Sequence, residues 1–333
     1  MSLPVGRHPG DRTSTGIVGI ESVTYGVADV SRGARFFEDF GLRPLERGAH
    51  GSTFGTPENT TIALRDEADP TLAAPVEPGP TVREIVWGVD SPASLDRLAA
   101  DLQRDRTTAV RPDGTIRTVD PAGYAIGFRV TERTPVRLEP ITLNTIGEAL
   151  RLNARAKFYD RATPQHIGHV VLYCPNFEQQ LAFYTDRLGF MVSDTLRGAG
   201  AFLRCSTDHH NLFLLRYHRA GLNHLSFGVE SLDEIMGGFK VLSERGWQPS
   251  WGPGRHYIGS NLFYYFRNPS GGHVEYYADM DCIANPELWT PEEFDPRAPE
   301  ALFAWGGYPP PEYRKAQWEL DADARAGAAP ETR

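Results

Sequence analysis

Residues 252–279 read GPGRHYIGSNLFYYFRNPSGGHVEYYAD, and they predict a β-hairpin that carries polar side chains. Two runs rich in aromatic and β-branched residues flank residues 268–272 (NPSGG), which have the composition of a turn. His256 and Tyr265 precede this turn, and Glu275 follows it. A glutamate in an apolar strand is costly to bury unless a cation compensates its charge. The stretch therefore predicts a bound metal or a partner charge.

Two upstream strands each contain a histidine that could join Glu275. These are His169 in HIGHVVLYC and His224 in GLNHLSFGV. Two neutral imidazoles and one carboxylate from different strands make the facial triad that leaves positions open on non-haem Fe(II). Taken singly, each histidine is more often a buried core residue, and Glu275 is more often a solvated strand residue. The hypothesis of a metal site rests on the set of three.

The spacing from His256 to Glu275 resembles the signature of the type I extradiol ring-cleaving dioxygenases of the vicinal oxygen chelate superfamily. The matching positions are Gly254-Arg255-His256, Tyr264-Tyr265, Asn268-Pro269-Ser270-Gly271 and Glu275. Tyr264 departs from the pattern, since the family usually has an aliphatic residue or Phe there. The resemblance is strong over about 165–280, and the N-terminal half resembles the family only in fold.

The resemblance implies roles for six residues. His169, His224 and Glu275 would hold Fe(II) or Mn(II), with O2 as cosubstrate. His210 matches the histidine that acts as acid and base on the substrate, and an unperturbed imidazole pKa near ~6.5 suits that role. The resemblance also implies that Tyr265 donates to the deprotonated catechol oxygen and that His256 orients the ring.

Two other histidines lie close to these residues in the sequence. His209 precedes His210 and should point to the opposite face of a strand, where we expect a structural or solvent role. His166 lies at odd spacing from His169 and should point outward. Neither is predicted to bind the metal.

The chain repeats internally, which predicts its fold class. A strand at 17–27 and a helix at 30–40 recur at 167–190, and the strand and helix at 82–102 recur at 222–242. The fold class is α+β, with four βαβββ modules that pair into two cupped, barrel-like domains, as in the vicinal oxygen chelate fold. At the positions of His169, His224 and Glu275 the first half has Ser22, Glu84 and Gly127, so any metal is expected in the C-terminal domain.

This repeat divides the chain into four regions. The regions are an N-terminal domain without metal ligands at 16–135, a linker at 136–163, a catalytic metal-binding domain at 164–282 and a tail rich in Pro and aromatic residues at 283–333. A helical pattern near 144–158 predicts one helix in the linker. Disorder is expected at residues 1–15 and at the polar end of the tail. The tail either covers the mouth of the C-terminal cup as a lid or wraps its outside.

Composition excludes several partners. The formal net charge is −9 without any tract of Lys or Arg, which argues against nucleic acid and acidic membranes as partners. No apolar run reaches membrane-spanning length. Three cysteines form neither a disulfide framework nor a zinc motif, which favours a reducing compartment. We expect a cytoplasmic homo-oligomer.

The triad and the family resemblance together imply an extradiol dioxygenase, an oxidoreductase of the EC 1.13.11 type, acting on a catecholic small molecule in aromatic hydrocarbon catabolism. The aromatic residues of the tail favour a substrate with a bulky apolar substituent, such as an aryl group. Three alternatives remain: a glyoxalase-like isomerase, a 2-oxo-acid-type dioxygenase and a non-enzymatic small-molecule binding protein.

Overall fold

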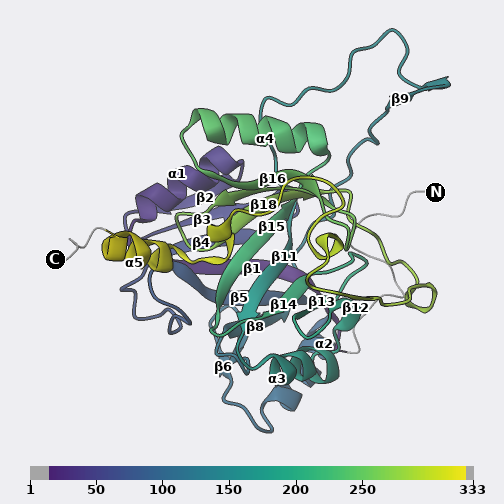
Figure 1. Ribbon diagram of the computed structural model, residues 1–333. Helices are drawn as coiled ribbons and strands as arrows, with labels where there is room; N and C mark the ends of the chain where they lie inside the picture. Colours follow the sequence, from purple (N-terminus) through teal and green to yellow (C-terminus); the bar gives the residue numbers. More distant parts are fainter. Residues whose placement is uncertain (1–14, 328–333) are drawn as a thin grey trace.

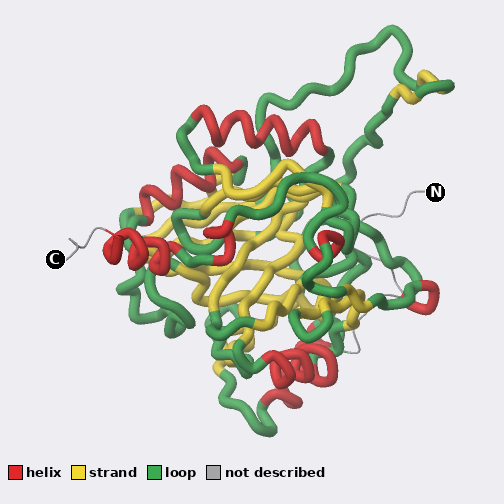
Figure 2. The backbone as a smooth tube through the Cα atoms, viewed as in Figure 1, coloured by secondary structure: helices red, strands yellow, loops and turns green. Residues whose placement is uncertain are grey.

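The computed structural model describes residues 15–327, which contain two large mixed β-sheets with helices on their outer sides (Figures 1 and 2). The first sheet has eight strands in the order β2-β3-β4-β1-β5-β8-β7-β6. Its elements are β1 (Ile17–Val27), α1 (Val30–Phe40), β2 (Arg43–Gly48), β3 (Gly51–Gly55), β4 (Thr61–Asp66), β5 (Thr81–Val89), α2 (Pro92–Leu102), β6 (Ala109–Val110), β7 (Ile116–Val119) and β8 (Ala125–Val130).

The second sheet has nine strands in the order β16-β17-β18-β15-β11-β14-β13-β12-β19. Its elements are β11 (His166–Cys174), α3 (Phe177–Ala182), a π-helical turn (Phe183–Arg187), β12 (Met191–Leu196), β13 (Gly200–Arg204), β14 (Leu212–Arg216), β15 (Gly221–Gly228), α4 (Leu232–Glu244), β16 (Pro249–Arg255), β17 (Leu262–Arg267), β18 (His273–Ala278) and β19 (Glu293–Phe294). The four βαβββ modules are therefore present, and the predicted fold class is confirmed.

Strand register shows that the two sheets correspond residue by residue at their centres. In the first sheet, Val86 of β5 pairs with Ser22 on one side and Gly127 on the other. In the second, Ser226 of β15 pairs with His169 and Glu275 in the same way. Glu84 and His224 each lie two residues before the central residue, Val86 or Ser226, so the correspondence expected from the repeat holds for all three positions.

Helix α1 illustrates how local sequence positions these layers. Asp29 caps its N-terminus by accepting a hydrogen bond from the Arg32 amide at 2.8 Å, and Gly41 ends it at φ 111°. Its buried residues recur at helical spacing and include Phe36, Phe37 and Phe40. Phe40 stacks on Tyr276 of β18 at 4.1 Å between ring centroids, so α1 packs against the second sheet as well as its own.

Neighbouring helices join the two domains on both sides of the molecule. Helix α1 lies beside α4 along one edge, and α2 lies beside α3 along the opposite edge (Figure 1). Arg187, just after α3, forms ion pairs with Asp101 of α2 at 2.7 Å and with Asp105 at 2.6 Å. One cluster of buried apolar residues runs through both sheets, so the domains share a core.

The linker and the tail differ from expectation. The predicted helix at 144–158 is wrong: the segment is largely exposed and forms only a small hairpin of β9 (Asn144–Thr145) and β10 (Glu148–Ala149), which projects from the body (Figure 1). An isolated helix of that length is marginal in water without a packing surface. In the tail, α5 (Gln317–Gly327) replaces part of the disorder that was expected.

The remaining expectations of disorder fall on residues 1–14 and 328–333, which lie outside the described residues. Within residues 15–327, no helix combines the length and apolarity that a membrane-spanning segment needs. Cys174 and Cys205 are buried in the apolar core, where a thiol packs as a small hydrophobic group.

Candidate metal centre

Three adjacent strands bring His169, His224 and Glu275 together on one face of the second sheet. The Nε2 atom of His169 lies 3.0 Å from a carboxylate oxygen of Glu275, and the Nε2 atom of His224 lies 3.5 Å from the same oxygen. All three side chains are buried, and their candidate ligand atoms lie within 4.8 Å of one another. Within the described part of the chain, this is the cluster whose His, Cys, Asp or Glu atoms are close enough to share one ion.

The charges in this cluster fit a bound divalent cation. Glu275 is fully buried, and no lysine or arginine among residues 15–327 forms an ion pair with it. Burial, together with the neighbouring His166 and His209 imidazoles, lowers the pKa of His169 to about 3. Burial also holds the pKa of His224 well below its usual value, although Glu275 opposes this shift. Both imidazoles are therefore neutral near pH 7 and cannot compensate the carboxylate.

Hydrogen bonds orient His224 as a ligand. Asn223 donates its amide N–H to the Tyr173 hydroxyl at 2.6 Å, which directs its amide oxygen to His224 Nδ1 at 2.5 Å. His224 must then carry its proton on Nδ1. Its Nε2 has no hydrogen-bond partner although it is buried, and it faces Glu275. An unpartnered lone pair held beside a buried carboxylate is what a metal ligand requires.

Two side chains support the Glu275 carboxylate. Ser226 donates its hydroxyl to one oxygen, and Asn261 donates its amide N–H to the other at 3.3 Å. Sequence reasoning missed Ser226, Asn261 and Asn223, because polar residues of this kind are common in strands and loops. Only the adjacency of Asn223 to His224 could have indicated a role in orienting a ligand.

The structure places His210, His256 and Tyr265 around the triad. The His210 ring lies 4.3 Å from the His169 ring, and the Tyr265 ring lies 5.0 Å from the His224 ring. His256 Nε2 lies 2.9 Å from the Tyr265 hydroxyl, and its Nδ1 lies 2.6 Å from the Leu302 carbonyl oxygen. The carbonyl can only accept, so His256 donates from Nδ1 and accepts the Tyr265 hydroxyl at Nε2.

The predictions for His209 and His166 need correction. The segment 205–211 is a loop of bends with one isolated β-bridge at Asp208 rather than a strand, so alternation along a strand does not apply to His209. His209 is fully buried and turned toward His210, with 3.0 Å between their Nδ1 atoms. His166 stays out of the triad as predicted, but it is also buried, and its Nε2 lies 2.9 Å from the Tyr277 hydroxyl.

His169 and His224 of the triad open into a cavity of about 100 Å³. His169, His224, His210, His256 and Tyr265 all line it. Apolar side chains form most of the remaining wall: Val171, Leu196, Phe202, Phe213, Leu215, Ile258, Ala301, Leu302 and Pro309. The site can therefore hold a metal and a small, largely apolar molecule side by side.

The tail contributes one wall of this cavity through Ala301, Leu302, Pro309, Tyr313 and Arg314. Backbone carbonyls hold this segment in place: His273 Nε2 lies 2.8 Å from the Tyr313 carbonyl oxygen, and Tyr173 donates its hydroxyl to the Arg314 carbonyl at 3.2 Å.

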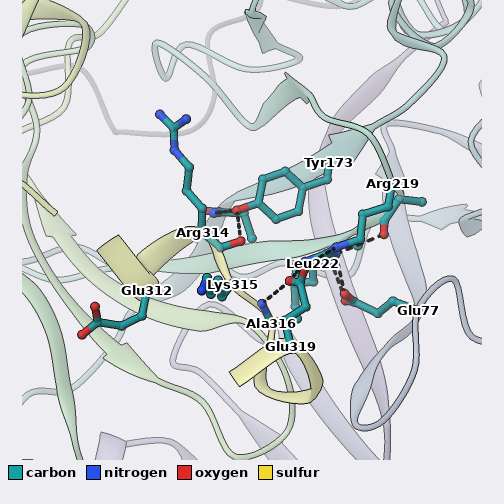
Figure 3. Close-up of polar contacts among 12 residues, drawn as sticks. Glu77, Tyr173, Arg219, Leu222, Glu312, Arg314, Lys315, Ala316 and Glu319 are labelled. Carbon is teal, nitrogen blue, oxygen red and sulfur yellow. Dashed lines mark hydrogen bonds and ion pairs between the residues drawn. The ribbon is translucent and has the colours of Figure 1, made fainter. Parts of the chain in front are cut away.

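A clamp fastens the C-terminal end of this tail to both domains. The guanidinium of Arg219 lies between Glu77 of the first domain, at 2.8 Å, and Glu319 of α5 (Figure 3). Glu77 also accepts the Leu222 amide at 2.9 Å, so the clamp is tied to β15, the strand that carries His224. The wall of the cavity is thus anchored to the strand that presents a metal ligand.

Comparison with known proteins agrees with this geometry. Residues 166–276 match the Glyoxalase/Bleomycin resistance protein/Dioxygenase superfamily. This region is a domain of that superfamily. The match includes His169, His224 and Glu275, so the vicinal oxygen chelate resemblance inferred from the sequence is confirmed for this region.

Two relatives show what the chain is similar to. Metapyrocatechase 2 of Cupriavidus necator is 32% identical over 195 residues, which cover 56% of this chain and 59% of that protein. An iron-dependent extradiol dioxygenase of Rhodococcus jostii is 32% identical over 157 residues, which cover 43% and 50%. The chain therefore matches between half and three fifths of the length of these relatives.

Among solved structures, the Mn(II)-bound glyoxalase from Novosphingobium aromaticivorans is 28% identical, with a TM-score of 0.70 and coverage of 89% of this chain and 93% of that chain. Proteins similar to this chain are thus described with iron and with manganese.

Proposed function

We propose that this protein is a metal-dependent extradiol dioxygenase that inserts both atoms of O2 into a catecholic ring. The observation that carries the proposal is the arrangement of His210, His256 and Tyr265 around the His169, His224 and Glu275 triad. These three residues line the same cavity as the two triad histidines. A structural role for the triad would not require three further polar groups directed at the same space. The names of the relatives support the same chemistry.

A divalent iron or manganese held by His169, His224 and Glu275 would lower the pKa of a bound catechol hydroxyl and leave coordination positions for substrate and oxygen. The chain's own residues then handle the remaining proton. Burial and the surrounding imidazoles keep the pKa of His210 well below its usual value, so His210 is neutral and can accept a proton.

Tyr265 and His256 form a pair that can act on the other catechol oxygen. Burial, with Glu275 adding to it, raises the pKa of Tyr265 well above its usual value, so its hydroxyl stays protonated and can donate. In the structure this proton is directed to His256 Nε2. A deprotonated catechol oxygen in the cavity would compete for it, while the Leu302 carbonyl keeps the His256 ring oriented.

The cavity wall favours an apolar substituent on the ring. Phe202 and Phe213 stack on each other at 4.0 Å between ring centroids, and both line the cavity with Leu196 and Leu215. Burial of an aryl or alkyl group against such a wall contributes about 25 cal/mol for each Å² removed from water. We infer that substituted catechols with bulky apolar groups bind more tightly than catechol itself.

The test is turnover by the metal-loaded protein. Protein reconstituted anaerobically with Fe(II), and separately with Mn(II), is mixed with a panel of 3- and 4-substituted catechols and then exposed to oxygen. A yellow ring-opened product, with uptake of one O2 per catechol, is expected. Metal-loaded protein that cleaves no catechol, and whose metal spectrum no catechol perturbs, would overturn the proposal.

The glyoxalase-like isomerase is the alternative that a comparison favours, because the solved structure described above carries that name. Turnover of a thiohemiacetal in the absence of oxygen, with no O2 uptake on catechols, would identify an isomerase. A 2-oxo-acid-type dioxygenase would be revealed by a 2-oxo acid, rather than a catechol, perturbing the metal spectrum. A binding protein would bind the catechol without converting it.

We also propose that the protein is cytoplasmic and forms a homo-oligomer. Light scattering after size-exclusion chromatography measures the mass of the assembly against the 37.0 kDa chain. A mass equal to one chain would remove the oligomer from the proposal and leave the chemistry untouched.

A further inference from the structure

A line of three buried side chains ends at the cavity. Asp194 of β12 lies with one carboxylate oxygen 2.9 Å from His209 Nε2, and His209 Nδ1 lies 3.0 Å from His210 Nδ1. The exposed fractions of Asp194, His209 and His210 are 4%, 0% and 4%. The His210 ring lines the cavity beside His169, so the line connects a buried carboxylate with the candidate active site.

Hydrogen-bonding rules determine which atoms donate and which accept along this line. A carboxylate only accepts, so the bond to Asp194 requires the proton of His209 on Nε2. A neutral imidazole carries a single N–H, which makes His209 Nδ1 an acceptor. His210 must then donate from Nδ1, and its Nε2, the nitrogen left for a bound molecule, carries a lone pair.

We propose that Asp194 and His209 are positioning residues that fix His210 in the tautomer with the proton on Nδ1, so that Nε2 is ready to take a proton from the substrate. This inference rests on the proposed function, in which His210 is the acid and base. It adds two residues, from β12 and from the loop at 205–211, that do not line the cavity themselves.

The surroundings hold the line rigidly. The other carboxylate oxygen of Asp194 accepts the Glu292 amide at 2.7 Å, so both oxygens of this side chain have defined partners. The His209 amide donates to the Asp281 carbonyl at 2.9 Å, and the Trp289 ring packs edge-on against the His209 ring at 5.5 Å. These contacts leave the two imidazoles little freedom to turn.

The Glu292 amide makes Asp194→Asn a sharp test. That N–H requires an acceptor, so the amide oxygen of the new side chain must face Glu292 and its NH2 must face His209. His209 Nε2 would then accept, His209 Nδ1 would donate, and His210 would carry its proton on Nε2. The substitution therefore exchanges donors and acceptors along Asp194, His209 and His210 with almost no change in side-chain shape. Asp194→Ala removes the hydrogen-bond partner of His209 Nε2 and therefore favours neither tautomer of His210.

Two readouts decide the inference. In kinetics, Asp194→Asn should lower kcat by ~10²-fold or more, with metal content and catechol affinity retained, while Asp194→Ala should lower kcat by only ~10-fold. A purely structural role predicts the opposite order, because the isosteric Asn preserves packing better than Ala. An Asn variant that is more active than the Ala variant would therefore overturn the inference.

The second readout does not depend on turnover. In Zn(II)-loaded protein labelled with ¹⁵N-histidine, the His210 ring signals, identified by their loss in His210→Gln, should show protonated Nδ1 in the wild type and protonated Nε2 in Asp194→Asn. A wild-type His210 protonated on Nε2 would contradict the inference even if catechols are cleaved. Inactivity of the wild type toward catechols would instead contradict the proposed function. The ¹⁵N spectrum would then still test which tautomer His210 adopts.

If Asp194→Asn fails to fold, His209→Phe serves in its place, since the pocket beside Phe202 and Trp289 already packs an aromatic ring. Loss of both ring nitrogens should leave His210 as a mixture of tautomers and lower kcat. A single Nδ1-protonated form in that variant would show that His209 does not set the tautomer.

Discussion

The two domains use the same scaffold around a buried glutamate and compensate its charge in different ways. In the first domain, Glu84 is 2% exposed and forms ion pairs with Arg111 and Arg117, both at 2.8 Å. At the equivalent strand position the second domain has His224, with Glu275 on the neighbouring strand, and two neutral imidazoles take the place of the two guanidinium groups. The first domain supplies its own cations, whereas in the second the proposed metal would supply the positive charge.

This difference shows that the sheet does not need the histidines in order to fold. Gly127 occupies the position of Glu275 in the first domain, and a Cβ added there would lie 2.9 Å from Thr115 Cγ2. The first domain has thus closed the space in which the second holds its ligands. The demands of packing therefore do not explain the His, His, Glu set, which supports the proposed metal site.

The largest expected effect is loss of the metal from the second domain alone. His169→Ala, His224→Ala and Glu275→Ala should each abolish binding of about one iron or manganese per chain, because each removes one of three ligands. Ser22→Ala, at the position of His169 in the first domain, is the matched control and should retain full occupancy. Metal analysis after dialysis measures both, and full occupancy in all three ligand variants would remove the metal site.

The next largest expected effect is on turnover, without an effect on binding of the metal or of catechol in the second domain. His210→Asn should lower turnover by roughly 10²–10⁴-fold, the usual contribution of an acid and base, while metal content and catechol binding stay unchanged. Steady-state kinetics and anaerobic titration with catechol give the two quantities. Unchanged turnover in His210→Asn would show that another group moves the proton.

A third experiment leaves the glutamate of the first domain without its cations. The double change Arg111→Ala with Arg117→Ala should lower the free energy of unfolding by about 2–3 kcal/mol, at the low end for a broken buried ion pair because both arginines are partly exposed. Metal content should not change. Urea denaturation measures the loss, and adding Glu84→Gln to the double variant should restore part of it.

The smallest expected effect is the change in the free energy of unfolding when a buried glutamate is neutralised. Its sign should differ between the two domains. In metal-free protein, Glu275→Gln should raise the free energy of unfolding by about 1–2 kcal/mol, because it removes a buried charge that no described arginine or lysine pairs with. Glu84→Gln should instead lower it, because two arginines lose their partner. Thermal unfolding after chelation compares the two variants, and shifts of the same sign would show that the two glutamates are compensated alike.

Local sequence patterns determined much of the fold. The strand at 17–27, the helix at 30–40 and the order of the four modules follow from periodicity and internal repetition, which act over short stretches of chain. The triad was also accessible from the sequence, because each ligand lies in a strand and the internal repeat aligns these strands with their counterparts in the first half. Resemblance to a known signature added His210, His256 and Tyr265.

Local sequence patterns gave wrong predictions where the structure of a segment depends on residues distant in the sequence. The helix predicted at 144–158 lacks a surface to pack on, and α5 forms where disorder was expected because Arg219 anchors its Glu319. His209 was predicted to point away from His210, but its segment is a loop of bends and not a strand, and the two rings face each other.

The sequence by itself determined which residues could bind a metal, since that depends on the chemistry of three side chains and on strand alternation. Only the tertiary structure decided how those residues are oriented. Asp194 contacts His209, Asn223 donates to Tyr173, and the Leu302 carbonyl of the tail accepts from His256. Such contacts join residues from separate strands and turns, and hydrogen bonds of a few ångströms form only once the sheet has closed.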